Sequence, residues 1–156
     1  CVNPGAGEAA TGSSAVDALL YQKQKQAEEH HIRWECDVQI PPACGIHEFD
    51  LCVLFGNLLD NALKACEKCP PEKNRRICVQ ARPVKHCFLL EIKNRTDLKN
   101  IDQFQFFLKH PADGHGIGLR NVRDVLQKYD GTLHMDLQED LLAASLLLPL
   151  QPPSRT

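Results

Sequence analysis

Apolar residues recur at intervals of three and four in three stretches of the chain. The longest stretch follows His47 and ends before Cys69, because the two prolines that come next forbid a helix to continue. An earlier stretch follows Ser13 or Ser14, either of which can cap a helix, and a later one follows Gly118. This spacing places the apolar side chains of each stretch on one helical face. The three faces comprise Leu51, Leu54, Phe55, Leu58, Ala62 and Ala65, then Val16, Leu19, Leu20 and Ala27, and finally Leu119, Val122, Val125, Leu126 and Tyr129.

Five shorter stretches have the alternating or concentrated apolar residues of β-strands. They cover residues 32–38, 77–81, 88–92, 132–137 and 141–148. Residues 82–85, Arg-Pro-Val-Lys, predict a hairpin connection between the second and third strands, and Asn94 is expected to end the third. The order helix, strand, helix, two strands, helix, two strands predicts an α+β domain. It is a two-layer α/β sandwich of five strands and three main helices.

The segments between and beyond these elements predict how the chain is divided. Residues 1–12 are expected to form a flexible leader and residues 151–156 a loose tail, which leaves residues 13–150 as the domain. The 21 residues between Asn94 and Gly116 show little regular pattern. A loop of that length in a compact domain is usually a functional lid or disordered.

Composition argues against several classes of function. At 156 residues the chain fits one domain with a proper core, and its formal charge of −2 gives no pull toward nucleic acid. No run of roughly eighteen apolar residues and no signal peptide appears. The eight cysteines are scattered, which favours buried free thiols in a reducing compartment over a disulfide framework. Cys66 and Cys69 form the only CxxC, and a structural zinc site would need a second such pair.

A row of polar side chains runs beside the apolar face of the longest helix. Asn57, Asn61 and Lys64 are spaced by four and three residues, so they share one flank. A buried amide without partners costs about 1–3 kcal/mol, and a ligand could supply those partners. An amide oxygen suits a hard cation such as Mg²⁺, and the lysine could meet phosphates. The alternative is that both asparagines cap neighbouring loops.

A second candidate site lies where glycines lead into the last helix. Residues 114–118 read Gly-His-Gly-Ile-Gly. Such a junction lets the backbone approach a phosphate, which the free N–H groups of the helix start can bind. His115 could hydrogen-bond a phosphate, hold a lid, or be a loop histidine without a ligand. A single Gly-x-Gly carries little weight by itself.

Together the two candidates resemble the motifs of a known superfamily. Residues 54–66, Leu-Phe-Gly-Asn-Leu-Leu-Asp-Asn-Ala-Leu-Lys-Ala-Cys, resemble the N-box of the GHKL ATPases, and residues 115–122 resemble their G2 box. The pair, in this order and about fifty residues apart, is specific. It is most similar to the ATP-binding domain of bacterial sensor histidine kinases of the quorum-sensing and citrate-sensor type. The resemblance covers roughly residues 14–149.

The resemblance implies a Bergerat ATP-binding fold. In that fold a five-stranded mixed sheet on one side faces helices on the other, and ATP lies between the helix layer and a long lid. The resemblance places Asn61 on Mg²⁺, Asn57 beside the metal and the phosphates, and Lys64 on phosphate.

The G2 box and the preceding loop supply further expected contacts. Gly116, Gly118 and Leu119 would offer backbone contacts to phosphate. Lys109 matches a lysine that the quorum-sensing type places ahead of this box, where it could reach the terminal phosphates. The serine or threonine that precedes that lysine in the family pattern is Leu108 here.

The nucleobase side departs from the superfamily pattern. The G1 box, Asp-x-Gly-x-Gly, whose aspartate recognises the adenine amino group, is replaced by residues 94–98, Asn-Arg-Thr-Asp-Leu. The quorum-sensing type also carries an asparagine there, so the resemblance places Asn94 at the nucleobase. Without a carboxylate we expect a softer preference for adenine over guanine. The alternative is that Asn94 merely terminates a strand.

The implied activity is transfer of the γ-phosphoryl group of Mg-ATP to a histidine. In this family that histidine lies on a dimerisation helix pair outside the catalytic domain, and no histidine here has that context, so no catalytic residue is assigned. The expected partners are ATP, the dimerisation helices of the same kinase and a downstream response regulator, with the fragment itself monomeric. We expect a cytoplasmic domain of a membrane-anchored receptor, and the start at Cys1 fits an excised fragment.

Two other functions fit the same motifs. The missing G1 glycines allow a degenerate GHKL module that serves in interaction or dimerisation without binding nucleotide. An anti-sigma-factor-type serine kinase has the same fold and would phosphorylate a protein substrate in trans.

Overall fold

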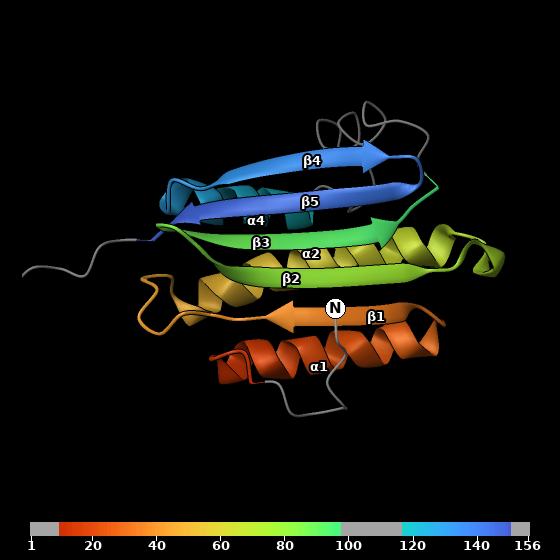
Figure 1. The fold of residues 1–156 in the computed structure, drawn as a ribbon, viewed down its shortest axis with the longest axis horizontal. Coiled ribbons are helices and arrows are strands. Elements are labelled where there is room, and N and C mark those ends of the chain that lie inside the picture. Colours follow the sequence, from red (N-terminus) through yellow and green to blue (C-terminus); the bar gives the residue numbers. More distant parts are fainter. Residues whose placement is uncertain (1–9, 98–116, 151–156) are drawn as a thin grey trace, which may run out of the picture.

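The structure is a computed structural model that describes residues 10–97 and 117–150. Within these ranges five strands form one sheet, and three α-helices form a second layer (Figure 1). The helices are α1 (Ser14–Glu29), α2 (Glu48–Lys68) and α4 (Ile117–Lys128), with a short 3₁₀ turn, η1, at Pro71–Lys73. The strands are β1 (Arg33–Val38), β2 (Arg76–Val84), β3 (Cys87–Arg95), β4 (Thr132–Gln138) and β5 (Leu141–Pro149).

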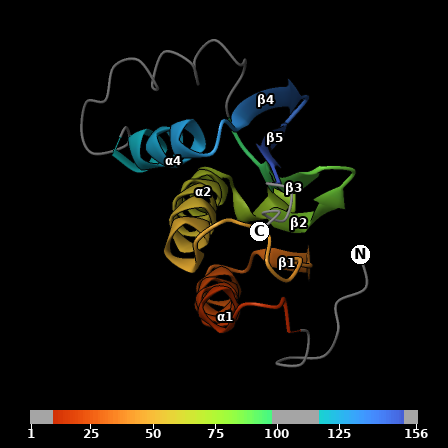
Figure 2. The ribbon, with the colours of Figure 1, turned by 90° about the vertical axis from the view of Figure 1, so that its left-hand side faces the viewer.

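The pairing of the strands makes the sheet mixed. Its order is β1-β2-β3-β5-β4, with β1 and β2 parallel and every other neighbouring pair antiparallel. α2 lies in the crossover that two parallel strands require. Figure 2 shows the three helices on one face of the sheet, with α1 beside β1, α2 in the middle and α4 toward β4. The predicted two-layer α+β sandwich with a five-stranded mixed sheet is confirmed.

The core lies between the two layers, and α2 is its centre. Leu54, Phe55 and Leu59 of α2 have no exposed surface. Fully enclosed residues on the facing strands include Val79, Leu90, Leu146 and Leu148. Burying one such side chain stabilises the fold by about 1.5–3 kcal/mol. Burial of this stripe therefore fixes the rotation of α2 about its axis, and with it the position of the polar row on the helix flank.

Both long helices begin where the sequence predicts. Ser13 caps α1 because its Oγ accepts a hydrogen bond from the Val16 N–H at 3.3 Å. His47 caps α2 because its Nδ1 accepts from the Phe49 N–H at 3.1 Å. α2 ends at Lys68, directly before the segment that carries the two prolines. Local sequence signals were sufficient for these boundaries.

The predicted position of the first hairpin, at residues 82–85, is wrong. β2 and β3 continue until only a two-residue turn separates them, and Lys85 in that turn adopts a left-handed φ of 56°. Pro83 is tolerated inside β2 because of where its nitrogen points. The Ala81 carbonyl accepts from the Gln39 N–H at 2.8 Å on the β1 side, so Pro83, two residues on, faces the same side. β1 has ended there, so no hydrogen bond is lost.

Several expectations fall outside the described residues. They concern most of the expected lid, residues 98–116, and the terminal segments 1–9 and 151–156. No helix within the described ranges is both long enough and apolar enough to span a membrane.

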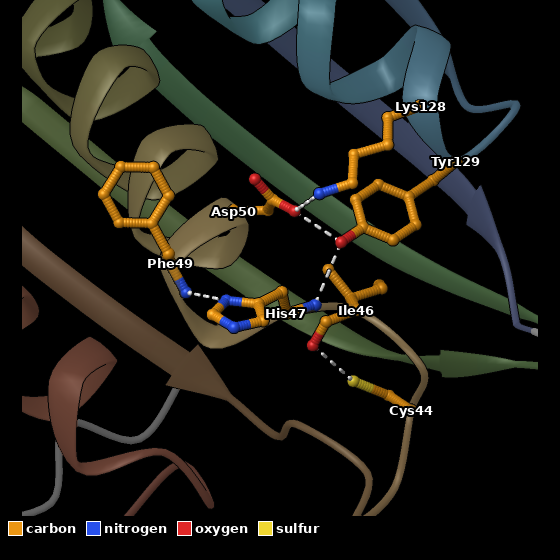
Figure 3. Close-up of polar contacts among 7 residues, drawn as sticks. All are labelled: Cys44, Ile46, His47, Phe49, Asp50, Lys128 and Tyr129. Atoms are coloured by element: carbon orange, nitrogen blue, oxygen red, sulfur yellow. Dashed lines mark hydrogen bonds and ion pairs between the residues drawn. The ribbon is translucent and has the colours of Figure 1, made fainter.

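A polar contact joins the start of α2 to the end of α4 (Figure 3). Asp50 accepts hydrogen bonds from the Tyr129 hydroxyl and from Lys128 Nζ, the latter at 2.9 Å. The Tyr129 hydroxyl in turn accepts from the backbone N–H of His47 at 3.1 Å. We call Asp50, Lys128, Tyr129 and His47 the α2–α4 lock. Only 8% of Asp50 is exposed, so its carboxylate depends on these partners more than on water.

The lock keeps Asp50 ionised. The hydrogen bond from Tyr129 lowers the pKa of Asp50, the hydrogen bond and charge of Lys128 lower it further, and burial opposes them. A folded-state pKa below the ordinary aspartate value means that the unfolded chain binds this proton more tightly. The ionised Asp50 therefore stabilises the folded state. This contribution is fully present above the aspartate pKa of the unfolded chain, about 3.9, and is lost as the pH falls through the lower pKa of Asp50 in the folded protein.

We predict that the destabilisation caused by Asp50→Asn is largest near neutral pH and shrinks below about pH 4. Asparagine cannot ionise, so only the wild-type protein loses this contribution on acidification. Urea unfolding of both proteins across this range measures the difference in free energy. The pKa of Glu35 is also lowered, chiefly by Arg76, but that group titrates in both proteins and cancels. A difference that stays constant with pH would contradict the prediction.

Candidate functional site

The predicted polar row lies along the edge of α2. Asn57 and Asn61 are half-buried, and Lys64 is exposed. Asn57 Nδ2 donates to the Val53 carbonyl one turn earlier at 2.7 Å, so among the described residues Asn57 bonds to its own helix. The Asn61 side chain makes no hydrogen bond to another residue of the ranges 10–97 and 117–150. Its amide is therefore available to a ligand.

The start of α4 approaches this row closely. A Cβ atom added to Gly118 would lie 3.0 Å from Asn57 Oδ1 and 3.6 Å from Asn57 Cγ. Real Cβ atoms seldom tolerate the first of these distances, so the missing side chain allows the two helices to come this near. The fold thus brings together one residue from each of the two predicted motifs.

The directions of the two helices decide which end of α4 faces the row. The start of α4 meets Asn57 through Gly118, whereas its end meets Asp50 through Tyr129. The helices are therefore antiparallel. Asn61 lies one turn, about 6 Å, beyond Asn57 on the side away from Asp50. The first N–H groups of α4, which have no intrahelical acceptor, and the positive end of its macrodipole therefore point toward Asn61.

Comparison with known protein families agrees with this geometry. A family model described as the GHKL domain matches residues 46–149, which is most of the chain and includes both motifs. The chain belongs to the GHKL family.

Solved structures share the fold of this GHKL domain at low sequence identity. The nucleotide-free catalytic domain of histidine kinase ThkA aligns with a TM-score of 0.69 at 13% identity, covering 89% of this chain and 93% of that one. The mycobacterial sensor histidine kinase MprB gives 0.66 at 22% identity, covering 89% and 94%. The Acinetobacter baumannii histidine kinase AdeS gives 0.67 at 15% identity, and here the alignment covers 89% of this chain but only 64% of AdeS. No curated protein sequence gives a significant match. The chain therefore has the Bergerat fold.

Asn94 lies beneath the second half of α2. It is 4% exposed and shares the helix-facing side of β3 with the core residue Ile92. Its Nδ2 donates to the Arg95 carbonyl at 2.9 Å, and Cys66 Sγ of α2 donates to the same carbonyl at 3.4 Å. β3 continues to Arg95, so Asn94 does not end the strand as expected. Asn94 thus places a polar side chain on the face of the sheet that packs against α2.

The remaining predicted site residues divide into two groups. Lys109, His115 and Gly116 lie outside the described residues, and their roles stay predictions. Leu119 is 6% exposed, and its side chain belongs to the core. Only its backbone can meet a ligand, which is the role predicted for it. Lys64 is exposed, three residues beyond Asn61 on the same flank.

The amide oxygens on α2 are suited to a magnesium ion that is bound together with phosphates. Mg²⁺ takes one or two protein oxygens and completes its coordination with water and phosphate oxygens. Asn61 can supply one amide oxygen of this kind. No group of three or more His, Cys, Asp or Glu that could hold a metal occurs among the residues described. The amide row is thus suited to a metal–phosphate complex rather than to a metal held by protein alone.

None of the described cysteines forms a disulfide, and two of them have strongly raised pKa values. Burial raises the pKa of Cys36 to about 12 and that of Cys66 to about 11. Both thiols are therefore protonated at neutral pH, and it is the thiolate that attacks or binds a metal. Cys66 Sγ donates to the carbonyls of Arg76 and Arg95 at 3.3 and 3.4 Å. It ties the end of α2 to β2 and β3.

Sequence reasoning missed the α2–α4 lock. The apolar spacing assigns Tyr129 only to the apolar face of the last helix and assigns no role to Asp50. A signal was present, since a buried tyrosine hydroxyl usually needs a hydrogen-bond partner. An aspartate in the first turn of α2, next to the core residue Leu51, is a second signal of the same kind.

We predict that Gly118→Ala and Gly56→Ala have opposite effects on stability. Gly56 is interior to α2, and an added Cβ would meet only Leu19 at an ordinary 3.8 Å, so Gly56→Ala should stabilise by about 0.5–1 kcal/mol. At Gly118 the new methyl group presses on Asn57, so Gly118→Ala should cost about 1–3 kcal/mol. Urea unfolding of the two variants measures both changes.

A third variant checks the cause of the Gly118 effect. In an Asn57→Ala background the added Cβ no longer meets an amide, so the cost of Gly118→Ala should largely disappear. An equal cost in both backgrounds would show that the contact with Asn57 is not the reason.

Proposed function

We propose that this GHKL domain is the ATP-binding catalytic domain of a sensor histidine kinase of the quorum-sensing and citrate-sensor type. The observation that carries the proposal is the contact of Gly118 with Asn57, because it directs the start of α4 toward Asn61. A helix start, a nearby amide oxygen and a lysine form a complementary set for a magnesium-bound triphosphate. The likeness to catalytic domains of histidine kinases supports the same assignment.

In this proposal each predicted residue has one role. Asn61 binds Mg²⁺, Asn57 supports the metal and phosphates, and Lys64 contacts phosphate. Gly118 and Leu119 offer backbone N–H groups.

Three residues that precede α4 complete the phosphate contacts. Gly116 offers a further backbone N–H group, Lys109 reaches the terminal phosphates, and His115 hydrogen-bonds a phosphate or holds the lid. Phosphoryl transfer depends mainly on positioning and on charge neutralisation, and these contacts provide both.

Asn94 would select the nucleobase. Its Nδ2 donates one of its two N–H groups to the Arg95 carbonyl, and the amide oxygen, a hydrogen-bond acceptor, can be offered to a base. An acceptor matches the amino group of adenine and mismatches the carbonyl oxygen of guanine. The second N–H group of the amide can still meet that oxygen, so the preference for adenine is softer than a carboxylate would give.

The remaining features of the proposal follow the family. Residues 13–150 form the catalytic domain, preceded by a leader at 1–12 and followed by a tail at 151–156. The γ-phosphoryl group passes to a histidine on a dimerisation helix pair, and from there to a response regulator. The domain itself would be monomeric, and it would work in the cytoplasm as part of a membrane-anchored receptor.

We predict that Asn61→Ala weakens binding of Mg-ATP by about tenfold or more, as expected for an interaction with a charged group. Calorimetry with Mg²⁺ and with a chelator separates the metal from the nucleotide, and the effect of Asn61→Ala should shrink when the metal is removed. Gln22→Ala, which removes an exposed amide on α1, serves as the control and should bind as the wild type does. GTP should bind more weakly than ATP. Equal binding of Mg-ATP by wild type and Asn61→Ala would remove Asn61 from the metal, and no binding by either would favour a degenerate module.

We predict that labelled phosphate moves from ATP to a separately made dimerisation helix pair and not to a sigma-regulator protein. The bond formed on a histidine is labile in acid, whereas phosphoserine survives it, so acid treatment of the product distinguishes the two acceptors. Acid-stable label on the sigma regulator would support the serine-kinase alternative instead.

A further inference from the structure

The α2–α4 lock lies at the opposite end of the helix pair from the phosphate side. Asp50 precedes Asn57 by seven residues, about 10 Å along α2, and on the side away from Asn61. Figure 3 shows the Asp50 carboxylate, the Lys128 ammonium and the Tyr129 hydroxyl converging between the two helices. A group in this place does not reach a phosphate bound at the start of α4. Any influence of the lock on that site must pass through the helices.

The Tyr129 hydroxyl at the centre of the lock has two hydrogen-bond partners. The Tyr129 hydroxyl donates to Asp50 and accepts from the His47 N–H at 3.1 Å, so its orientation is fixed from both sides. His47 is also the N-cap of α2. The lock therefore ties the last turn of α4 to the first residues of α2, and not merely to its surface.

α4 is anchored at the same end by its connection to β4. The Gly131 N–H donates to the Leu126 carbonyl at 2.8 Å, and Asp130 adopts a left-handed φ of 55°. This is the hydrogen-bond pattern of a Schellman C-cap. A Cβ added to Gly131 would lie 2.8 Å from Leu126 Cδ2, so this turn has no spare room.

A helix of this length transmits the position of its end to its start. α4 spans 12 residues, about 18 Å, and is held on the core by Leu119, Val122 and Leu126. The start of α4 has little room to move toward α2, because the Gly118 backbone already lies against Asn57. A tilt of α4 that began at a broken lock would move the first N–H groups relative to Asn57.

We propose that Asp50 and Tyr129 are positioning residues for the phosphate site: through α4 they hold its first turn against Asn57 without touching the nucleotide. This inference rests on the proposed function for its effect on ATP. The part of the inference that concerns the position of the first turn of α4 does not depend on nucleotide binding.

The test uses Tyr129→Phe, which removes the hydroxyl and keeps the ring. Hydrogen exchange is followed at the Asn121 and Val122 N–H groups, whose intrahelical acceptors are the carbonyls of Ile117 and Gly118. The control is Val38→Ala in β1, which destabilises the core at the sheet edge far from α4 (Figure 2). We expect exchange at these two groups to rise about tenfold in Tyr129→Phe, and to rise less in Val38→Ala at equal global stability.

Binding provides the second arm, with ATP and adenosine as the two probes. Adenosine lacks phosphates, so Tyr129→Phe should weaken ATP by about tenfold and leave adenosine unchanged. Asp50→Ala should act in the same way. Asp50→Asn should retain more affinity for ATP, because its amide oxygen can still accept from Tyr129.

The outcomes separate this inference from the proposed function. Equal weakening of ATP and adenosine, or exchange at Asn121 and Val122 no faster than in Val38→Ala, would overturn the positioning role. If the wild type binds neither nucleotide, the proposed function fails, and the exchange measurement alone decides whether the lock places the start of α4.

Discussion

The close approach of α4 to α2 at Gly118 and Asn57 is the contact on which the rest of the site depends. Helix axes usually lie about 8–10 Å apart, with the distance set by the side chains between them. Here Gly118 has no side chain, and the Asn57 amide occupies the space between the helices. The start of α4 is therefore placed against a polar residue, at the edge of a helix whose other face is deeply buried. This juxtaposition turns a structural contact between helices into a candidate phosphate site.

Three buried charges in the described part of the chain, Lys23, Glu35 and Asp50, pair with partners on other elements. Lys23 of α1 pairs with Asp60 of α2 at 2.5 Å, and Asp50 of α2 receives Lys128 at the end of α4. Glu35 of β1 is held by Arg76 of β2 at 2.8 Å. Removing one partner from such a pair leaves a poorly solvated charge, which is costly. α2 is thus fixed to the sheet by apolar burial and to each neighbouring helix by a charged contact.

This arrangement suits a chemistry that is carried out by positioning. The thiols of Cys36 and Cys66 are protonated at neutral pH, and no cluster of acids or histidines in the described ranges could hold a metal alone. The candidate site instead offers amides, helix N–H groups and a lysine. Such groups bind charge without taking part in covalent steps, so their value depends on how accurately the helices hold them. The structural elements that orient α4 are for this reason part of the functional argument.

The sequence by itself determined the elements of the fold and the residues of both motifs. Apolar periodicity and capping residues are local signals, and they located α1 and α2 at their N-termini and ended α2 before the prolines. Where a local signal was misleading, the reason was tertiary: Pro83 predicts a turn, but it is accommodated in β2 because β1 stops short of it.

Only the tertiary structure decided how these parts meet. The spacing of Asn57, Asn61 and Lys64 predicts a shared flank, but the antiparallel crossing of α2 and α4 determines that the α4 start points toward Asn61. The orientation of Asn94 depends on its hydrogen bond within β3. The contact of Asp50 with Tyr129 joins residues 79 positions apart, and no local pattern encodes such a pair. Local periodicity records which face of an element is buried, whereas the packing of the elements decides which polar groups face one another.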